Sequence, residues 1–267
     1  MDDASSPSTY REFAPSPALR RHLVCLWAQA VGGPHAHEQP VLPDGCIDLL
    51  WIDDQPPVVV GPATRAMTAL LPPNTVITGL RFRPGIAPAL LRTPADRLLD
   101  AEVDLQALIG RSARSFQQPS SEARIADRLA AAEAALHQAL PDLAPIDTLV
   151  TQATAWLAHH PDGRVADLAR LTDLGGRQLQ RRFIAALGYG PKTAQRILRL
   201  QHAVALAAEM PTLSLADIAV AGGYADQAHM TRDFGMLAGQ TPTTVLGRAW
   251  STLSPAGLFS GIHDQAA

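Results

Sequence analysis

The chain contains an internal repeat, and this repeat restricts the possible folds more than any other feature of the sequence. Residues 165–183 (VADLARLTDLGGRQLQRRF) resemble residues 215–234 (LADIAVAGGYADQAHMTRDF). Equivalent positions are fifty residues apart, with one extra residue in the second copy after the turn. Before and at the turn, Asp167-Leu168-Ala169 corresponds to Asp217-Ile218-Ala219 and Leu174 corresponds to Tyr224. After the turn, Leu179, Arg181 and Phe183 correspond to Met230, Arg232 and Phe234.

Both copies have the pattern of a short helix, a tight turn and a longer helix. Ala169 and Ala219 lie where two crossing helices approach closely, a position that requires a small side chain. The apolar residues around them form the wedge between the helices. Such a turn, often containing glycine, joins the helices of the DNA-binding helix-turn-helix. Its second helix lies in the major groove with its N-terminal residues toward the base edges. The repeat therefore predicts two helix-turn-helix units.

The second helix of each unit leaves mainly polar residues on its outer face. They are Arg177, Gln178, Gln180 and Arg181 in the first unit and Gln227, Ala228, Thr231 and Arg232 in the second. Arg and Gln suit bidentate contacts with guanine and adenine edges, although both are also ordinary residues of an exposed helix. Two copies in the same register favour DNA contacts over that alternative.

The distribution of charge supports the same interpretation. The whole chain has a formal net charge of −3, but residues 145–250 contain ten Lys or Arg and eight Asp or Glu. Between Arg177 and Arg199 there are six basic residues and no acidic one. A positive stripe of this kind is the electrostatic footprint of a nucleic-acid-binding surface. We expect Lys192, Arg196 and Arg199 to contact phosphates or to pack the helix that joins the units.

Apolar runs and turn residues predict an α+β chain with two main domains. Short runs before residue 85 are typical of a β sandwich or small barrel, and the sequence after Pro145 is helical. The expected strands are His22–Val31, Ile47–Ile52, Val58–Val60 and Val76–Phe82. The expected C-terminal helices are Ile146–His159, Val165–Leu171, Gly176–Leu187, Pro191–Glu209, Leu215–Ala221, Asp226–Ala238 and Pro242–Trp250. The predicted regions are a β-rich domain with helices (1–118), an amphipathic helix and linker (119–144), an all-α DNA-binding domain (145–250) and a weakly ordered tail (251–267).

The segment Glu122–Leu140 has apolar residues at spacings of three or four, which predicts a helix with one apolar face. This face either packs on its own domain or forms the seam of a homodimer. The sequence leaves both alternatives open.

Residues 145–250 resemble the C-terminal domain of the AraC/XylS family of bacterial transcription regulators. The resemblance is carried by L-x-R-x-F at Leu179–Phe183, G-x-x-P at Gly188–Pro191, R-L-x-x-A at Arg199–Ala203, I-A-x-x-x-G-Y at Ile218–Tyr224, H-M-x-R-x-F at His229–Phe234 and G-Q-T-P at Gly239–Pro242. In that family one long helix joins the two units, and Pro191–Glu209 corresponds to it. The resemblance implies binding to double-stranded DNA, regulation of transcription without catalysis, and RNA polymerase as a partner. It places His229 near the phosphate backbone.

The sequence departs from the family pattern mainly in the second unit. Gly235 follows Phe234 where a basic residue is usual, Ala228 stands in the contact face, and Val245-Leu246 replaces the common terminal Tyr-Arg. In the first unit Gly175 replaces the usual capping Ser, a change that costs only a few tenths of a kcal/mol. We therefore expect the first unit to contribute more of the DNA affinity.

Two strings in the N-terminal part, Leu42–Asp48 (LPDGCID) and Gly79–Gly85 (GLRFRPG), are its most distinctive feature. They resemble a domain of uncertain function that precedes the DNA-binding part in a subset of AraC-type regulators. The resemblance implies a cupin-like sensing domain whose small-molecule effector changes DNA binding or activation.

The candidate effector-binding residues are Trp27, Cys46, Trp51, Arg81 and Arg83. Arg81 and Arg83 are two residues apart on an expected strand and therefore share a face. They either clamp an anionic effector or pair with Asp44, Asp48 or another carboxylate to fix the fold. The two Trp residues either line a pocket or belong to the core.

The remaining polar motifs give only weak support to metal binding, cysteine reactivity or enzymatic catalysis. His35-x-His37 followed by Cys46 hints at a metal site, but no Glu stands four or five positions past the second His, so no metal or cofactor is expected. Cys25 and Cys46 are either inert and buried or a redox or alkyl-accepting pair. The main rival to a regulator is a metal-dependent cupin enzyme fused to a DNA-binding module, and a purely architectural DNA protein fits less well.

The start of the chain, MDDASSPSTYREF, lacks a basic segment followed by an apolar run, so no secretory signal is expected. No uninterrupted apolar stretch reaches the ~18 residues of a membrane span. Together with a charged fraction of 18% and only two cysteines, these features predict a cytoplasmic protein with no membrane partner.

Overall fold

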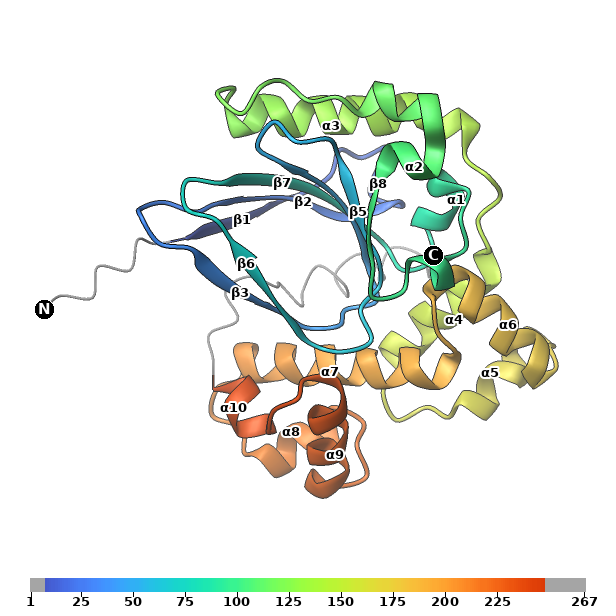
Figure 1. Cartoon of the computed structure of the whole chain (residues 1–267). Coiled ribbons are helices and arrows are strands. Elements are labelled where there is room, and N and C mark those ends of the chain that lie inside the picture. Colours follow the sequence, from blue (N-terminus) through green and yellow to red (C-terminus); the bar gives the residue numbers. More distant parts are fainter. Residues whose placement is uncertain (1–7, 248–267) are drawn as a thin grey trace, which may run out of the picture.

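The computed structural model describes residues 8–247 and contains a β-rich N-terminal domain followed by a helical C-terminal domain (Figure 1). The α+β order predicted from the sequence is confirmed. The predicted tail (251–267) lies outside the described residues, as do residues 248–250 at the end of the last predicted helix.

The main sheet of the N-terminal domain has six antiparallel strands in the order β1-β2-β7-β4-β5-β8. Three of the four expected strands, Ile47–Ile52, Val58–Val60 and Val76–Phe82, have the predicted bounds. The strands of the sheet are β1 (Thr9–Phe13), β2 (Leu23–Ala30), β4 (Ile47–Ile52), β5 (Val58–Val60), β7 (Val76–Phe82) and β8 (Glu102–Asp104).

A second sheet consists of β3 (His37–Val41) paired antiparallel with β6 (Met67–Leu71). It covers one face of the main sheet, with a small apolar core that includes Val24, Trp27 and Ile77 between the two. The sequence did not predict this sheet, because its first strand, HEQPV, contains a proline and three polar residues.

Strand pairing sorts the residues of the main sheet onto two faces. Cys25 and Asp48 both lie opposite Arg81, on β2 and β4 on either side of β7. Because directly paired residues point to the same face, these three side chains share the face that the β3–β6 sheet covers. Leu26 and Leu49 flank Leu80 in the same way on the opposite face, which belongs to the larger core.

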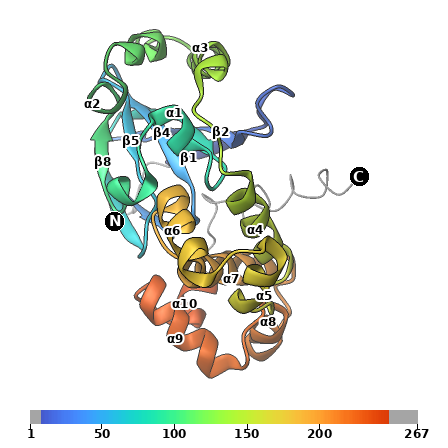
Figure 2. The ribbon, with the colours of Figure 1, turned by 90° about the vertical axis from the view of Figure 1, so that its right-hand side faces the viewer.

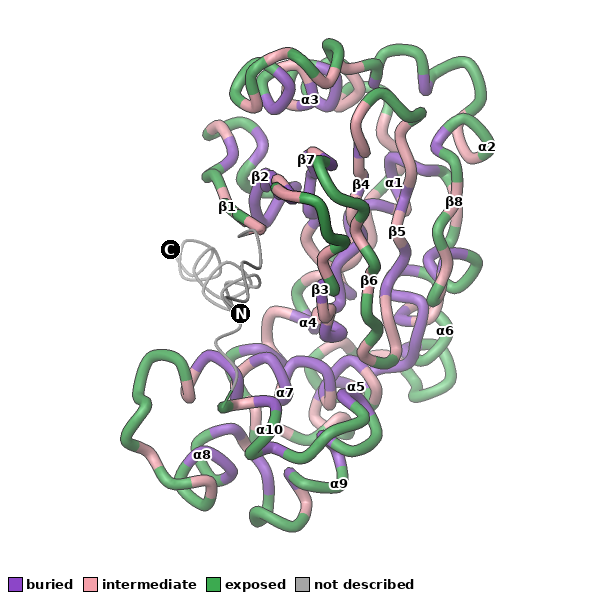
Figure 3. The backbone as a smooth tube through the Cα atoms, turned by 60° about the vertical axis from the view of Figure 1, so that its left-hand side comes forward, coloured by how far each residue is buried: buried purple, intermediate pink, exposed green. Residues whose placement is uncertain are grey.

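Helical segments cover that opposite face, and β2 and β7 are buried as a result (Figure 3). They are α1 (Ala87–Leu91), η1 (Ala95–Leu98), α2 (Leu105–Ile109), η2 (Gly110–Phe116) and α3 (Ile125–Ala139). The apolar side of α3, with Leu129, Ala132 and Leu136, is buried in this core. The apolar face thus packs on its own domain, the first of the two alternatives, and a homodimer seam stays untested.

The C-terminal domain contains seven helices within the described residues, in close agreement with the predicted ranges. They are α4 (Thr148–His159), α5 (Val165–Thr172), α6 (Gly176–Leu187), α7 (Pro191–Glu209), α8 (Leu215–Ala221), α9 (Gln227–Leu237) and α10 (Pro242–Leu246). The short segment η3 (Leu140–Asp142) leads from α3 toward α4. Figures 1 and 2 show α6 and α7 directly beneath the β-rich domain and α8, α9 and α10 farther from it.

The two domains are packed together. Leu42 from the N-terminal domain belongs to the same apolar core as the helices of the C-terminal domain, which also includes the buried Tyr189. Gly188, at the end of α6, has φ +86°, and a Cβ atom there would lie 3.0 Å from Pro62 and 2.9 Å from Leu99. A glycine at this position therefore allows the left-handed turn and the close approach of the two domains.

Candidate nucleic-acid interface

The two helix-turn-helix units have the same local geometry. In the first, the Leu174 N–H donates to the Ala169 carbonyl after Asp173 takes a positive φ of 51°. In the second, the Tyr224 N–H donates to the Ala219 carbonyl after Gly223 takes a positive φ of 78°. The sequence repeat is thus also a repeat of backbone conformation.

Each unit also starts its first helix in the same manner. The side chain of Asp167 accepts the Arg164 backbone N–H at 3.1 Å, and the side chain of Asp217 accepts the Ser214 N–H at 3.3 Å. These carboxylates satisfy amides that have no partner within the helix.

The predicted wedge between the helices is present in both units. The fully or nearly fully buried residues are Leu168, Leu179 and Phe183 in the first unit, and Ile218, Ala219, Tyr224, Met230 and Phe234 in the second. Leu174 and Ala169 are only half-buried, so the first unit is less tightly closed around its turn than the second.

The proposed base-reading side chains all lie on the surface, although both domains are in place. The exposed residues are Arg177, Gln178, Gln180 and Arg181 on α6 and Gln227, Ala228, Thr231 and Arg232 on α9. Lys192, in the first turn of α7, is exposed as well. The contact between the domains covers the C-terminal end of α6 and leaves its N-terminal half accessible.

Arg196 does not lie free for phosphate contact. Its Nε donates to Asp233 Oδ1 at 3.0 Å and its Nη2 lies 3.0 Å from Met236 Sδ, so it ties α7 to α9. Asp233 is 3% exposed. Arg199 Nε similarly donates to the Pro161 carbonyl at 2.5 Å. Of the two roles expected for these arginines, the structure shows the packing role, and the DNA contact of Arg196 stays a prediction.

An ion pair between α6 and the start of α4 was not predicted from the sequence. Arg182 on α6 donates to both carboxylate oxygens of Asp147, at 2.6 and 2.7 Å. Asp147 also accepts the Val150 N–H and so caps α4. Arg182 lies in the basic stripe, and its position beside Asp147 depends on how α4 packs on α6, so residue type alone gave no signal.

The helices that carry the exposed residues differ in their caps. Asp226 caps α9 by accepting the His229 N–H at 2.6 Å, whereas Gly175 offers no side chain to α6. The His229 imidazole lies 3.8 Å from Asp233 and is half-buried.

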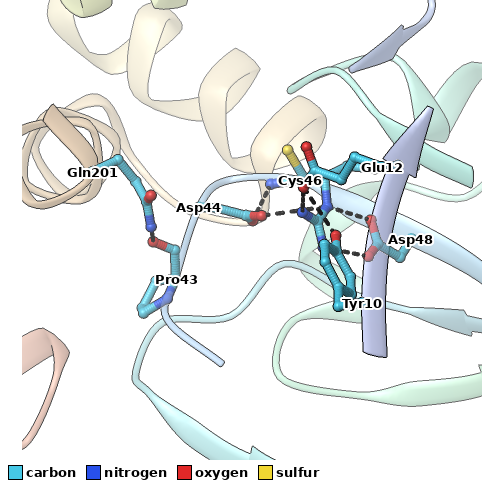
Figure 4. A network of polar contacts seen from close by, with 8 residues as sticks. Tyr10, Glu12, Pro43, Asp44, Cys46, Asp48 and Gln201 are labelled. Carbon is cyan, nitrogen blue, oxygen red and sulfur yellow. Dashed lines mark hydrogen bonds and ion pairs between the residues drawn. The ribbon is translucent and has the colours of Figure 1, made fainter. Parts of the chain in front are cut away.

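In the N-terminal domain, Arg81 is the centre of a buried polar cluster (Figure 4). Its Nε and Nη2 donate to the two oxygens of Asp48 at 3.1 and 2.9 Å. Asp44 lies 3.6 Å and Glu12 3.9 Å from the guanidinium. Arg81 therefore pairs with local carboxylates, the second of the two roles expected from the sequence.

Arg83 does not point with Arg81 into this cluster as a two-arginine anion site would require, because its Nε donates to the Arg20 carbonyl at 2.8 Å. Trp51 lies on the opposite, helix-covered face, where its Nε1 donates to the Phe116 carbonyl at 2.7 Å. The five candidate effector residues are therefore split, and only Cys46, Arg81 and Trp27 remain on one face. The Arg81 guanidinium lies 6.0 Å from the Trp27 ring.

Cys25 and Cys46 are both free and buried. Burial raises the pKa of both the Cys25 and the Cys46 thiol, which disfavours the reactive thiolate. His37 lies 3.3 Å from the Gln39 side chain. Within residues 8–247 no group of three or more His, Cys, Asp or Glu side chains is placed to hold a metal ion. In the same residues, no helix is both long and apolar enough to cross a membrane.

Comparison with known proteins agrees with this arrangement of helices. Residues 168–248 match a family described as a helix-turn-helix domain. The HTH-type transcriptional regulator GlxA of Rhizobium meliloti (strain 1021) is 37% identical over 84 residues. The C-terminal domain is an AraC-type helix-turn-helix domain. The GlxA match covers 32% of the chain and only 26% of GlxA. Outside this AraC-type domain, residues 11–104 match a domain of unknown function, DUF6597.

Solved structures of ToxT from Vibrio cholerae also align with the chain. An apo ToxT variant from strain SCE256 aligns over 84% of this chain and 96% of its own length, with 11% identity and a TM-score of 0.45. ToxT of the same strain with a bound unsaturated fatty acid aligns over 92% of this chain and 97% of its own, with 10% identity and a TM-score of 0.42.

Proposed function

We propose that the chain is a sequence-specific DNA-binding transcription regulator of the AraC type, active in the bacterial cytoplasm and working with RNA polymerase. The observation that carries the proposal is the exposure of equivalent polar residues on α6 and α9, which remain accessible with both domains packed together. Two such helices held by one long helix suit successive major-groove segments on one face of DNA, about 10 bp apart.

The two helices differ in what they offer to DNA. The exposed face of α6 contains two arginines and two glutamines, whereas that of α9 contains Arg232, Gln227, Thr231 and Ala228. The Thr231 hydroxyl donates to the Gln227 carbonyl within its own helix. We expect α6 to supply more base-specific contacts and Lys192 to contact phosphate.

The N-terminal domain is proposed to bind a small-molecule effector that changes DNA binding. Its packing against α6, α7 and α9 supports the idea that a change within the domain reaches the DNA-binding helices. An effector acts on the equilibrium only through different affinities for the two states of the protein.

The direct test is selection of bound duplexes from a random double-stranded DNA library with the full-length protein. The expected result is a consensus with two conserved tracts about 10 bp apart, centre to centre. Binding that shows no sequence preference after repeated selection, and that disappears with moderate salt, would indicate only non-specific phosphate contact and would reject the proposal.

A further inference from the structure

A cavity of about 200 Å³ lies in the N-terminal domain, beside the Arg81 cluster, and its wall includes Leu42, which also belongs to the core of the C-terminal domain. Its walls include two loops, one with Asp44 and Cys46 and the other with Gly61 and Ala63. The side chains of Asp48 and Arg81 form part of the wall on the main sheet. Figure 4 shows the Asp44 loop passing between the Arg81 cluster and helix α7. Known small-molecule sites are concave spaces of this kind with a few convergent polar groups.

The cavity wall carries excess negative charge. Asp44, Asp48, Asp100 and Glu102 line it, against the single guanidinium of Arg81. Asp48 already occupies two N–H groups of that guanidinium. Asp44 Oδ1 accepts the Cys46 N–H at 2.8 Å, while Asp44 Oδ2 lies 3.6 Å from Arg81 Nε, which is too far for a hydrogen bond.

Asp44, Asp48 and Glu12 share the single Arg81 guanidinium, whereas Asp100 and Glu102 are exposed and Asp100 also accepts hydrogen bonds from Thr64. Burial raises the pKa of Asp44, and the charge of Asp48 adds to this effect against the opposing charge of Arg81. A carboxylate that is removed from water without a full complement of partners is costly. A cation placed in the cavity would supply the missing charge and the missing hydrogen-bond donors, whereas an anion would meet repulsion from several carboxylates.

From this geometry we infer that the cavity binds a small organic cation, an amine or a guanidine, between Asp44 and the wall formed by Gly61 and Ala63. The inference deepens the proposed function, because it names the chemical class of the effector. It also reverses the charge that the pair Arg81 and Arg83 suggested in the sequence.

The loops that line the cavity also hold the DNA-binding domain. Next to Asp44, the Pro43 carbonyl accepts a 2.7 Å hydrogen bond from the buried Gln201 side chain of α7. Beyond Ala63, the Ala66 N–H donates to the Leu237 carbonyl at the end of α9, at 2.6 Å.

The same two loops reach α6. A Cβ atom on Gly45 would lie 3.1 Å from the Tyr189 hydroxyl, just past α6, and Pro62 packs against Gly188. A ligand that draws the two loops together in the cavity therefore acts on both recognition helices.

The test uses full-length protein and three probes of similar length and different charge: putrescine, butanediol and succinate, with agmatine as a second cation. Binding is measured by calorimetry for the wild type, Asp44→Asn and Ala63→Leu, the last of which fills the cavity without changing charge. Glu122→Gln, an exposed carboxylate far from the cavity in the sequence, is the control for loss of one negative charge.

We expect putrescine or agmatine to bind, and butanediol and succinate not to bind. Asp44→Asn should weaken binding by about tenfold, as for loss of a charge-assisted hydrogen bond, and Ala63→Leu should abolish it, while Glu122→Gln leaves it unchanged. Failure of both cations to bind the wild type, tighter binding of succinate, or full binding by Asp44→Asn and Ala63→Leu would overturn the inference.

Coupling is measured separately, as the change in affinity for a selected DNA duplex when the cation is added. The expected change is about 5- to 150-fold, and Gln201→Met should reduce it while preserving cation binding. If the protein selects no DNA sequence but still binds putrescine, the proposed function fails and the site remains. If it selects a DNA sequence but binds no cation, the proposed function stands and the cation site is rejected.

Discussion

The ion pair between Arg196 and Asp233 gives the sharpest test of the packing in the second helix-turn-helix unit. Asp233 is 3% exposed and the Arg196 side chain is 23% exposed, so removal of the arginine leaves a buried carboxylate without its main partner. Breaking a buried pair costs 3–5 kcal/mol, and the partial exposure of Arg196 places the expected cost near the lower limit, at about 3 kcal/mol. For a chain of this size this corresponds to a fall in Tm of about 6–12 °C.

The assay is thermal and urea unfolding of Arg196→Ala beside Arg181→Ala, which makes the same side-chain change at an exposed position. Arg181→Ala should change stability by less than about 0.5 kcal/mol. A second variant, Arg196→Met, retains the apolar stem and separates loss of packing from loss of charge. The reasoning is refuted if Arg196→Ala keeps the wild-type Tm and instead lowers DNA affinity uniformly across sequences with a smaller salt dependence, the signature of a phosphate contact.

Three further changes test other contacts. Asp147→Asn keeps the helix cap but removes the charge that pairs with Arg182, and should cost about 1 kcal/mol at neutral pH in urea unfolding. Although burial opposes it, hydrogen bonding to Arg182 and Val150 lowers the pKa of Asp147. The stabilisation is therefore present above the unfolded-state pKa and is lost as the pH falls below about 4, so the wild type and Asp147→Asn should converge there. Gly175→Ser supplies the missing side-chain cap of α6, because φ there is −63° and a Cβ atom meets nothing within 4 Å. The Tm should rise by an amount equivalent to about 0.5 kcal/mol. A fall in Tm would contradict the assignment of Gly175 as the cap. Lys192→Ala should weaken binding to all duplexes alike and reduce the slope of log affinity against log salt by about 1, and a change in sequence preference would contradict this role.

The C-terminal domain was predictable because its repeat links sequence to helix packing at short range. The small and apolar residues at matching positions, such as Ala219 and Phe234, specify where two adjacent helices cross, and glycines and prolines mark the helix ends. The partner of Arg196 was not predictable in this way. Asp233 is 37 residues away along the chain, and the contact exists only because α7 packs across α9.

The N-terminal domain was predictable only in part. Its buried strands stood out, but β3 (HEQPV) contains a proline and three polar residues, and neither β3 nor β6 (MTALL) alternates clearly between polar and apolar residues. The face of Trp51 was available from the sequence, since in Ile47–Ile52 it has the same parity as Leu49 and the opposite parity to Asp48. Asp44 and Asp48 were candidate partners of Arg81 in the sequence, but the choice between this pairing and an effector clamp required the strand register, which single-sequence patterns do not determine.

The central claim is that α6 reads bases and does so more strongly than α9. It is tested most directly by measuring the affinities of wild type, Arg181→Ala and Arg232→Ala for the selected duplex and for every single-base-pair variant of it. We predict that Arg181→Ala costs about 1–3 kcal/mol and relaxes preference at one or two positions of a single tract, while Arg232→Ala costs less. An equal loss of affinity on all duplexes for Arg181→Ala, with sequence preference retained, would contradict the claim.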